Sequence, residues 1–335
     1  MLARAATDLS TGSMELTSRG NVQFRSVTDT DELASRFADA GLLPSPTHER
    51  VRNILASPLT GRVGGLADVS ALISELDRAL CSRPELADLP GRTLFALDDG
   101  RGDVIGSGPD FGVQAVARDR YALILAGSDS GVRIGSDAIV DVLLDAARLF
   151  VEFRSTQWRL SELSDGPARI LASLNLVPTT QAPLPVASVN VPPIGWLPQF
   201  DGRVSVGGAL ALATLDARLA EFVAAVDKPV VVTPWRSLLV CDLDEDVADT
   251  VLRVLAPMGL IFDENSPWIE ATACTGSPGC EKSHSDVRAD LTVAVDSQQI
   301  EPGRRQHWSG CERRCGRPSG DVLDVIAGPS GYRVS

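Results

Sequence analysis

The amino-acid sequence runs through one order of elements twice. Each copy has an extended stretch, a helical pattern, a Gly-Leu pair and then a Ser-Pro pair. These are residues 16–27, 29–40, Gly41-Leu42 and Ser45-Pro46 in the first copy, and residues 232–243, 245–257, Gly259-Leu260 and Ser266-Pro267 in the second. A repeated order of elements indicates duplication of a supersecondary unit. We therefore expect two related α/β halves.

A strand and a helix precede the second copy, whereas only part of a helix precedes the first copy. Residues 204–208 are typical of a short strand that ends in a glycine turn, and residues 210–226 show a helical pattern. Before the first copy there are only the helix-like residues 2–9. We therefore expect the first half to lack its first strand, and an in-frame upstream extension to supply it.

The charge balance limits the ligands that the chain can bind. The chain has 335 residues and a formal net charge of −13, which argues against a nonspecific nucleic-acid surface. No apolar run approaches the roughly 20 residues of a membrane helix, and charges interrupt the N-terminus where a signal peptide would be apolar. We expect a cytoplasmic protein without nucleic-acid or membrane partners. A local basic patch would have to hold any anionic ligand.

Polar and apolar side chains alternate along residues 15–26. If these residues form one strand, its polar face carries Thr17, Arg19, Asn21, Gln23 and Arg25. A solvent-facing sheet surface would explain the alternation by itself. However, two arginines and two amides in one row also suit a ligand with many carboxylates. Arg50, Arg52 and Asn53 follow in the sequence and add further donors.

Four of the six cysteines lie in the last part of the chain. Five residues separate Cys274 from Cys280, and three separate Cys311 from Cys315. Zinc sites prefer closer pairs, so this spacing favours an iron–sulfur cluster, with a structural zinc site as the alternative. Cys81 and Cys241 lie in a helical pattern and in an apolar strand, and we expect them to be small core residues.

Residues 273–280 (ACTGSPGC) and 308–316 (WSGCERRCG) resemble the two cluster motifs of the nitrite and sulfite reductase family. The resemblance covers nearly the whole chain, and residues 16–25 (LTSRGNVQFR) resemble the family's ligand-binding strand. Residues 48–58, 233–236 and 307–318 are most similar to the precorrin-3B synthase branch of this family, which serves aerobic cobalamin biosynthesis.

The resemblance implies an α+β fold with a duplicated plan, in which ferredoxin-like half-domains alternate with larger α/β modules. The expected domains are a first ferredoxin-like half-domain that lacks its first strand (1–60), a first α/β module (61–175), a linker (176–198), a second ferredoxin-like half-domain (199–264) and a 4Fe-4S-binding module (265–335).

The resemblance also implies an oxidoreductase, an O2-dependent monooxygenase that hydroxylates precorrin-3A at C20 with formation of a γ-lactone. An external donor fed by NAD(P)H would supply the electrons, and a 4Fe-4S cluster on Cys274, Cys280, Cys311 and Cys315 would relay them. The carboxylates of this tetrapyrrole would be bound by Arg19, Asn21, Gln23, Arg25, Arg52 and Arg236.

Two other functions stay open. A siroheme-dependent assimilatory nitrite or sulfite reductase has the same motifs, but residues 89–95 lack the lysines that face the bound anion in sulfite reductases. An electron-transfer or truncated binding module is a non-enzymatic alternative. Oxygen activation would also suit a mononuclear non-haem iron, for which His284 and His307 are candidates. Surface or supporting roles are the simpler interpretation of both histidines.

Overall fold

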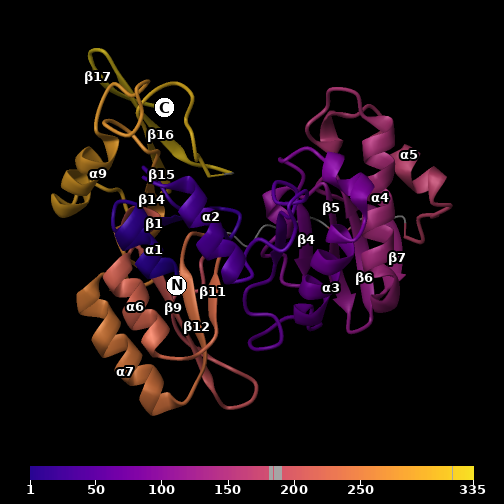
Figure 1. Ribbon diagram of the computed structural model, residues 1–335, viewed down its shortest axis with the longest axis horizontal. Coiled ribbons are helices and arrows are strands. Elements are labelled where there is room, and N and C mark those ends of the chain that lie inside the picture. Colours follow the sequence, from indigo (N-terminus) through magenta and orange to yellow (C-terminus); the bar gives the residue numbers. More distant parts are fainter. Residues whose placement is uncertain (181–183, 185–190, 319) are drawn as a thin grey trace. The chain divides into compact units, whose positions relative to one another are not determined.

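The computed structural model describes residues 1–180, 184, 191–318 and 320–335, so the middle of the predicted linker (181–183 and 185–190) lies outside the described residues. The chain forms two compact units (Figure 1). The first contains residues 1–28, 192–198 and 202–335, and the second contains residues 29–191 and 199–201. The predicted five-part division stays a prediction. No helix in the described part is long and apolar enough to cross a membrane.

The first unit contains two small sheets, one around each copy of the repeat, and the first of them also takes β10 from the residues that precede the second copy. One has the strand order β10-β1-β2, and the other has the order β11-β12-β9-β13 with β8 beside β9. Helices α1, α6 and α7 lie beside these strands (Figure 1), and apolar side chains of the three helices and of both sheets form one core. The strands are β1 (Ser13–Leu16), β2 (Val22–Gln23), β8 (Gly195–Pro198), β9 (Val204–Leu210), β10 (Thr214–Asp216), β11 (Val230–Val232), β12 (Leu238–Leu243) and β13 (Leu260–Ile261). The helices are α1 (Leu2–Leu9), α6 (Ala217–Ala225) and α7 (Glu245–Leu255).

The duplication is visible in two hairpins of the same construction. We call β1, β2 and their turn the first hairpin, and β11, β12 and their turn the second hairpin. In the first, Thr17 N–H donates to Asn21 O at 2.9 Å and Gly20 N–H donates to Thr17 O at 3.1 Å. In the second, Thr233 N–H donates to Ser237 O and Arg236 N–H donates to Thr233 O, both at 3.0 Å. The repeat read from the sequence therefore corresponds to one backbone motif used twice.

The expected single strand over residues 15–26 is wrong. The chain reverses after Leu16, because Gly20 adopts a φ of +66° that an extended strand does not allow. The apolar residues Leu16, Val22 and Phe24 still contact the core of the first unit. The polar row is thus divided between the turn and the second strand of a hairpin.

The expected helix over residues 210–226 is also partly wrong, since α6 begins only at Ala217. Strand β9 continues through Gly207 and Gly208 instead of ending in a turn there. A Cβ on Gly207 would lie 1.9 Å from Pro193 O, and one on Gly208 would lie 2.4 Å from the Leu260 side chain. These glycines allow β8 and β13 to approach β9 closely.

The C-terminal part of the first unit is a four-stranded sheet in the order β14-β15-β16-β17. The first three strands are parallel neighbours, and the last is antiparallel. Helix α9 (Val287–Asp296) contacts β14 and β15. The strands are β14 (Ala271–Ala273), β15 (Gln306–Ser309), β16 (Leu323–Gly328) and β17 (Gly331–Val334), and a short helix α8 (Pro267–Glu270) precedes them.

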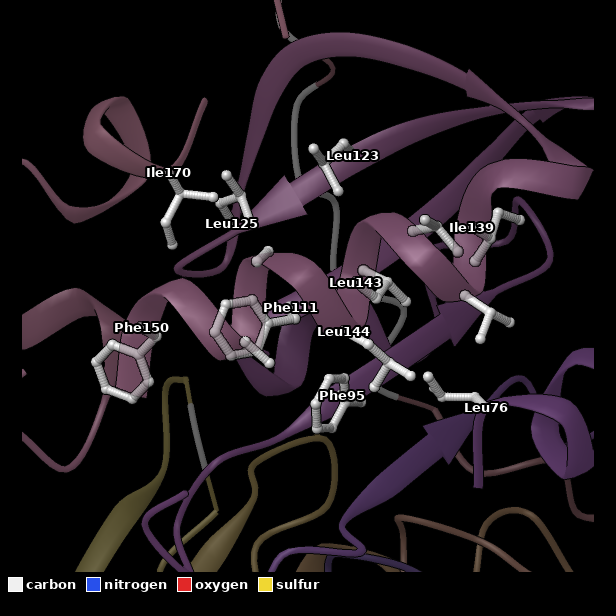
Figure 2. Packing of buried hydrophobic residues seen from close by; sticks show 14 of the residues in the cluster. Leu76, Phe95, Phe111, Leu123, Leu125, Ile139, Leu143, Leu144, Phe150 and Ile170 are labelled. Atoms are coloured by element: carbon white, nitrogen blue, oxygen red, sulfur yellow. The ribbon is translucent and has the colours of Figure 1, made fainter. Parts of the chain in front are cut away.

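The second unit is built on a five-stranded sheet in the order β3-β4-β5-β6-β7. Helix α4 lies along one face of this sheet, where Leu143, Leu144 and Phe150 pack against Phe95 and Phe111 (Figure 2). The strands are β3 (Ile54–Ala56), β4 (Phe95–Asp98), β5 (Phe111–Ala117), β6 (Arg120–Leu125) and β7 (Ser128–Gly135). The helices are α2 (Thr30–Asp39), α3 (Ser70–Cys81), α4 (Ile139–Phe153) and α5 (Gly166–Ser173).

Candidate functional site

Two of the four clustered cysteines follow neighbouring parallel strands. Cys274 comes directly after β14, and Cys311 comes two residues after β15. The pairing of these strands continues beyond their ends, because Cys274 N–H donates to Trp308 O at 2.9 Å. Parallel strands place their carboxyl ends at one edge of a sheet, so both cysteines lie at the same edge.

The loop that carries Cys280 is hydrogen-bonded to the same edge. Ser283 N–H donates to Cys280 O at 3.0 Å, and His284 N–H donates to Gly310 O at 2.8 Å. Gly310 N–H in turn donates to the Sγ of Cys274 at 3.2 Å. An amide aimed at a cysteine sulfur is one of the features that set the reduction potential of an iron–sulfur cluster.

Cys315 is the exposed member of the group, whereas Cys274, Cys280 and Cys311 are half-buried. Cys241 is buried in β12, and Cys81 ends helix α3 in the second unit. Two cysteines at one sheet edge and a third on a loop bonded to that edge, with an amide directed at one sulfur and Cys315 four residues after Cys311, fit a 4Fe-4S cluster. The ligand assignment itself stays a prediction.

A cavity of about 380 Å³ lies beside the first cysteine loop. Its walls come from four parts of the first unit: the first hairpin, residues 212–214, the cysteine loop and the start of α9. Among the predicted ligand-binding residues, Gln23 and Arg25 line it. Thr275, Ser277 and Gly279 of the cysteine loop line the same cavity. The structure therefore brings two of the five residues of the predicted polar row to the same cavity as the first cluster motif.

A chain of polar contacts connects this cavity with Cys274. Arg25 Nε lies 2.7 Å from one carboxylate oxygen of Glu15, and Arg288 Nη2 lies 2.6 Å from the other. Arg288 Nε also donates to Cys274 O at 3.3 Å. Sequence reasoning missed Glu15 and Arg288 as site residues. Glu15 stands at the start of the alternating row, but nothing in the sequence pairs it with Arg288.

Arg236 lies at the turn of the second hairpin, where its Nη2 donates to Gly316 O at 2.9 Å. The pKa of Arg236 is lowered, first by burial of the guanidinium and then by repulsion from Arg288 and Arg305, while Glu15 opposes the shift. The structure thus places Arg236 beside the second cysteine motif, in the same unit as the cavity. Its predicted role in substrate binding stays a prediction.

The other predicted ligand residues lie in different settings. Arg19 is part of the first hairpin turn, and Asn21 is exposed after it, with its N–H donating to Thr17 Oγ1 at 3.1 Å. Arg52 belongs to the second unit, where it binds both carboxylate oxygens of Asp77 at 2.8 and 3.0 Å. A ligand carboxylate at Arg52 would therefore have to exchange with Asp77.

The histidines do not gather into a metal site in the described part of the chain. His307 is fully buried, with Nδ1 2.9 Å from the Thr272 hydroxyl and Nε2 without a hydrogen bond. Burial lowers its pKa to about 4, and nearby Arg236 acts in the same direction. His284 is exposed, and His48 is a buried residue of the second unit. The second iron stays an untested expectation.

Comparisons with known proteins agree with the resemblance read from the motifs. No family model matches the chain. It is 25% identical to a precorrin-3B synthase from Sinorhizobium sp, over 99% of this chain and 74% of that protein. It is 26% identical to a ferredoxin sulfite reductase of Mycolicibacterium paratuberculosis, over 94% of this chain and 64% of that protein. The chain thus spans just under two thirds of the sulfite reductase.

The fold is that of the NirA protein of Mycobacterium tuberculosis, which superposes with a TM-score of 0.80 over 99% of this chain and 69% of that chain, at 20% identity. The expected resemblance to the nitrite and sulfite reductase family and the expected duplicated α+β plan are therefore confirmed.

Proposed function

We propose that this chain, which is similar in sequence to precorrin-3B synthase and to sulfite reductases and shares the fold of NirA, is a precorrin-3B synthase. In this proposal it is an O2-dependent monooxygenase that hydroxylates precorrin-3A at C20 with formation of a γ-lactone. One oxygen atom of O2 enters the product and the other leaves as water. Two electrons come from NAD(P)H through an external donor.

The observation that carries the proposal is the placement of Gln23 and Arg25 in one cavity with the cysteine loop 275–279. Precorrin-3A is a polycarboxylate, and an arginine fork can bind both oxygens of one carboxylate. The cavity of about 380 Å³ is the size of a small ligand site, so it would accept a part of the tetrapyrrole. The macrocycle would extend beyond it.

Cys274, Cys280, Cys311 and Cys315 would hold a 4Fe-4S cluster. When bound, the cluster supplies single electrons from the external donor. The residues of this chain would then do the binding and orientation: Arg25 and Gln23 would bind the carboxylate edge of precorrin-3A, and the amide of Gly310 would bind a cluster thiolate. The substrate would thus be held next to the loop that carries the cluster.

A siroheme-dependent nitrite or sulfite reductase is the second candidate. The sulfite reductases among the relatives and the shared fold with NirA support it. The absence of lysine from residues 89–95 speaks against it, because reduction of sulfite or nitrite needs positive charge and protons at the bound anion. A bound tetrapyrrole cofactor would distinguish the two.

The test is anaerobic purification followed by assays for iron, acid-labile sulfide and porphyrin. The first proposal predicts four sulfides and four cluster irons per chain, with a fifth iron only where the expected mononuclear site is filled. It also predicts no siroheme absorption, and conversion of precorrin-3A in the presence of O2 and a reduced donor. Cys311→Ser should remove the cluster, while Cys241→Ser is the matched control that should retain it. A chain that is purified with siroheme and reduces sulfite would overturn the proposal in favour of the second candidate.

A further inference from the structure

Each of the two hairpins is connected to one of the cysteine motifs through an arginine. The second hairpin contributes Arg236, whose Nη2 donates to Gly316 O, the residue after Cys315. The first hairpin contributes Glu15, which holds Arg288 at 2.6 Å while Arg288 Nε donates to Cys274 O at 3.3 Å. The duplicated halves thus reach both cysteine motifs in a similar way.

The backbone at Arg236 adopts a conformation that glycine takes up more readily than arginine. Arg236 has a φ of +60°, in the left-handed region that favours glycine. The corresponding position of the first hairpin is Gly20, with a φ of +66°. Glycine would relieve the steric strain at the second turn too. Strain of this kind is often retained where a side chain serves a function.

The two arginines also leave positive charge beside the cysteines. Among the described residues, Arg236 meets a carbonyl rather than a carboxylate, and Arg288 shares the single carboxylate of Glu15 with Arg25. Carbonyl oxygens orient a guanidinium without neutralising it. A cluster held by four thiolates is anionic, and becomes more so when it is reduced. Positive charge nearby therefore favours the reduced state.

We propose that Arg236 and Arg288 are positioning residues that fix the two cysteine loops and raise the reduction potential of the cluster. The inference rests on the part of the proposed function that assigns a cluster to the four cysteines. It does not depend on which substrate the protein converts. It gives Arg236 a role at the cluster in addition to the predicted contact with substrate.

Four variants of the reconstituted protein separate the fixing of the cysteine loops from the effect on the reduction potential. Arg236→Gly removes the side chain and relieves the backbone strain, so the fold should persist. Arg288→Gln removes the charge, whereas Arg288→Lys keeps the charge but cannot bind Glu15 and Cys274 O in the same geometry. Arg253→Gln is the control, because this arginine is in the same unit, 77% exposed, and paired with Asp249 on the surface of α7.

The measurements are the midpoint potential of the cluster in a dye-mediated titration and the rate of cluster loss to a chelator. Arg236→Gly and Arg288→Gln should shift the potential downward and lose the cluster about 10-fold faster, as for other residues that support metal ligands. Arg288→Lys should keep a potential close to that of the unaltered protein but lose the cluster faster. Arg253→Gln should change neither.

Potentials and loss rates of Arg236→Gly and Arg288→Gln equal to those of Arg253→Gln would overturn the proposal. Faster cluster loss without a change in potential would overturn its electrostatic part. If the unaltered chain itself takes up no cluster, the cofactor assignment of the proposed function fails instead. The two failures are therefore distinguishable.

Discussion

Gly310 donates its backbone N–H to the Sγ of Cys274, so that residues far apart in the sequence meet at one sheet edge. The position admits no side chain, because a Cβ on Gly310 would lie 1.8 Å from Ser283 Oγ and 2.7 Å from Ser283 Cβ. Ser283 belongs to the loop that follows Cys280. Gly310 therefore controls the contact between the cysteine loops as well as the hydrogen bond to sulfur.

Gly310→Ala should loosen the cluster while leaving the rest of the fold intact. The added methyl group must displace the loop of Ser283, so we expect about 10-fold faster cluster loss to a chelator. Gly328→Ala is the matched control in the neighbouring β16, where the nearest atom to an added Cβ is 3.6 Å away. Equal rates of cluster loss in the two variants would show that the close contact at Gly310 is unimportant.

Arg25→Gln should weaken binding of precorrin-3A without removing the cluster. A hydrogen bond to a charged group contributes about 1.5–3 kcal/mol, which corresponds to a loss of affinity of roughly 10-fold or more. Affinity can be measured by fluorescence or absorption titration with precorrin-3A, with iron content as the check on the cluster. Arg253→Gln again serves as the control. Unchanged affinity of Arg25→Gln would place the carboxylate site elsewhere.

Asp103→Asn should change how stability depends on pH. Burial is the main cause that raises the pKa of Asp103 to about 6, against the hydrogen bond from Ser57 at 2.5 Å. Because the folded-state pKa is raised, the folded protein binds more protons than the unfolded chain between about pH 4 and 6. This carboxyl therefore makes stability fall by about 2–3 kcal/mol as the pH rises through that window.

The measurement for Asp103 is urea unfolding at several pH values. Asp103→Asn should remove this fall and make the protein more stable than the unaltered chain at pH 7. Asp249→Asn, at an exposed aspartate of α7, is the control for a general change of charge. A difference in stability between Asp103→Asn and the unaltered chain that stays constant from pH 4 to 7 would contradict the raised pKa.

The two hairpin threonines should differ in their contribution to stability. Thr233 is fully buried, with its hydroxyl 2.7 Å from Ser237 Oγ. Thr17 is half-exposed, and its Oγ1 accepts the Asn21 N–H at 3.1 Å. Thr233→Val leaves a buried hydroxyl without its partner, so we expect a loss of about 1–3 kcal/mol in the free energy of unfolding. Thr17→Val should cost less, and an equal or larger loss at Thr17 would contradict this account.

The duplication could be predicted because the same order of elements occurs twice in the sequence. The cysteine motif could be predicted because the separations between its cysteines are typical of cluster ligands. The hairpin turns were not predicted, because an alternating pattern such as that of residues 15–26 does not show where the chain reverses. Gly20 was the signal for reversal. In β9 the glycines were misread as a turn, since the close approach of Pro193 and Leu260 that requires them is a tertiary contact.

The site was predicted only in part, because some of its contacts are also tertiary contacts between distant parts of the sequence. Gln23 and Arg25 could be recognised from a local polar row, and the cavity contains them. Glu15 and Arg288 are 273 residues apart in the sequence, and only the fold, which places the first hairpin and the start of α9 around one cavity, brings them together. Ion pairs at such separation leave no pattern in a single sequence.

The central claim is tested most directly by the product formed from precorrin-3A. The reconstituted protein should be incubated with precorrin-3A, a reduced electron donor and 18O2, and the product analysed by mass spectrometry. The account predicts the gain of one labelled oxygen atom, dependent on the donor and lost in Cys311→Ser but not in Cys241→Ser. Unchanged precorrin-3A in the presence of an intact cluster, or an oxygen atom that carries no label, would contradict it.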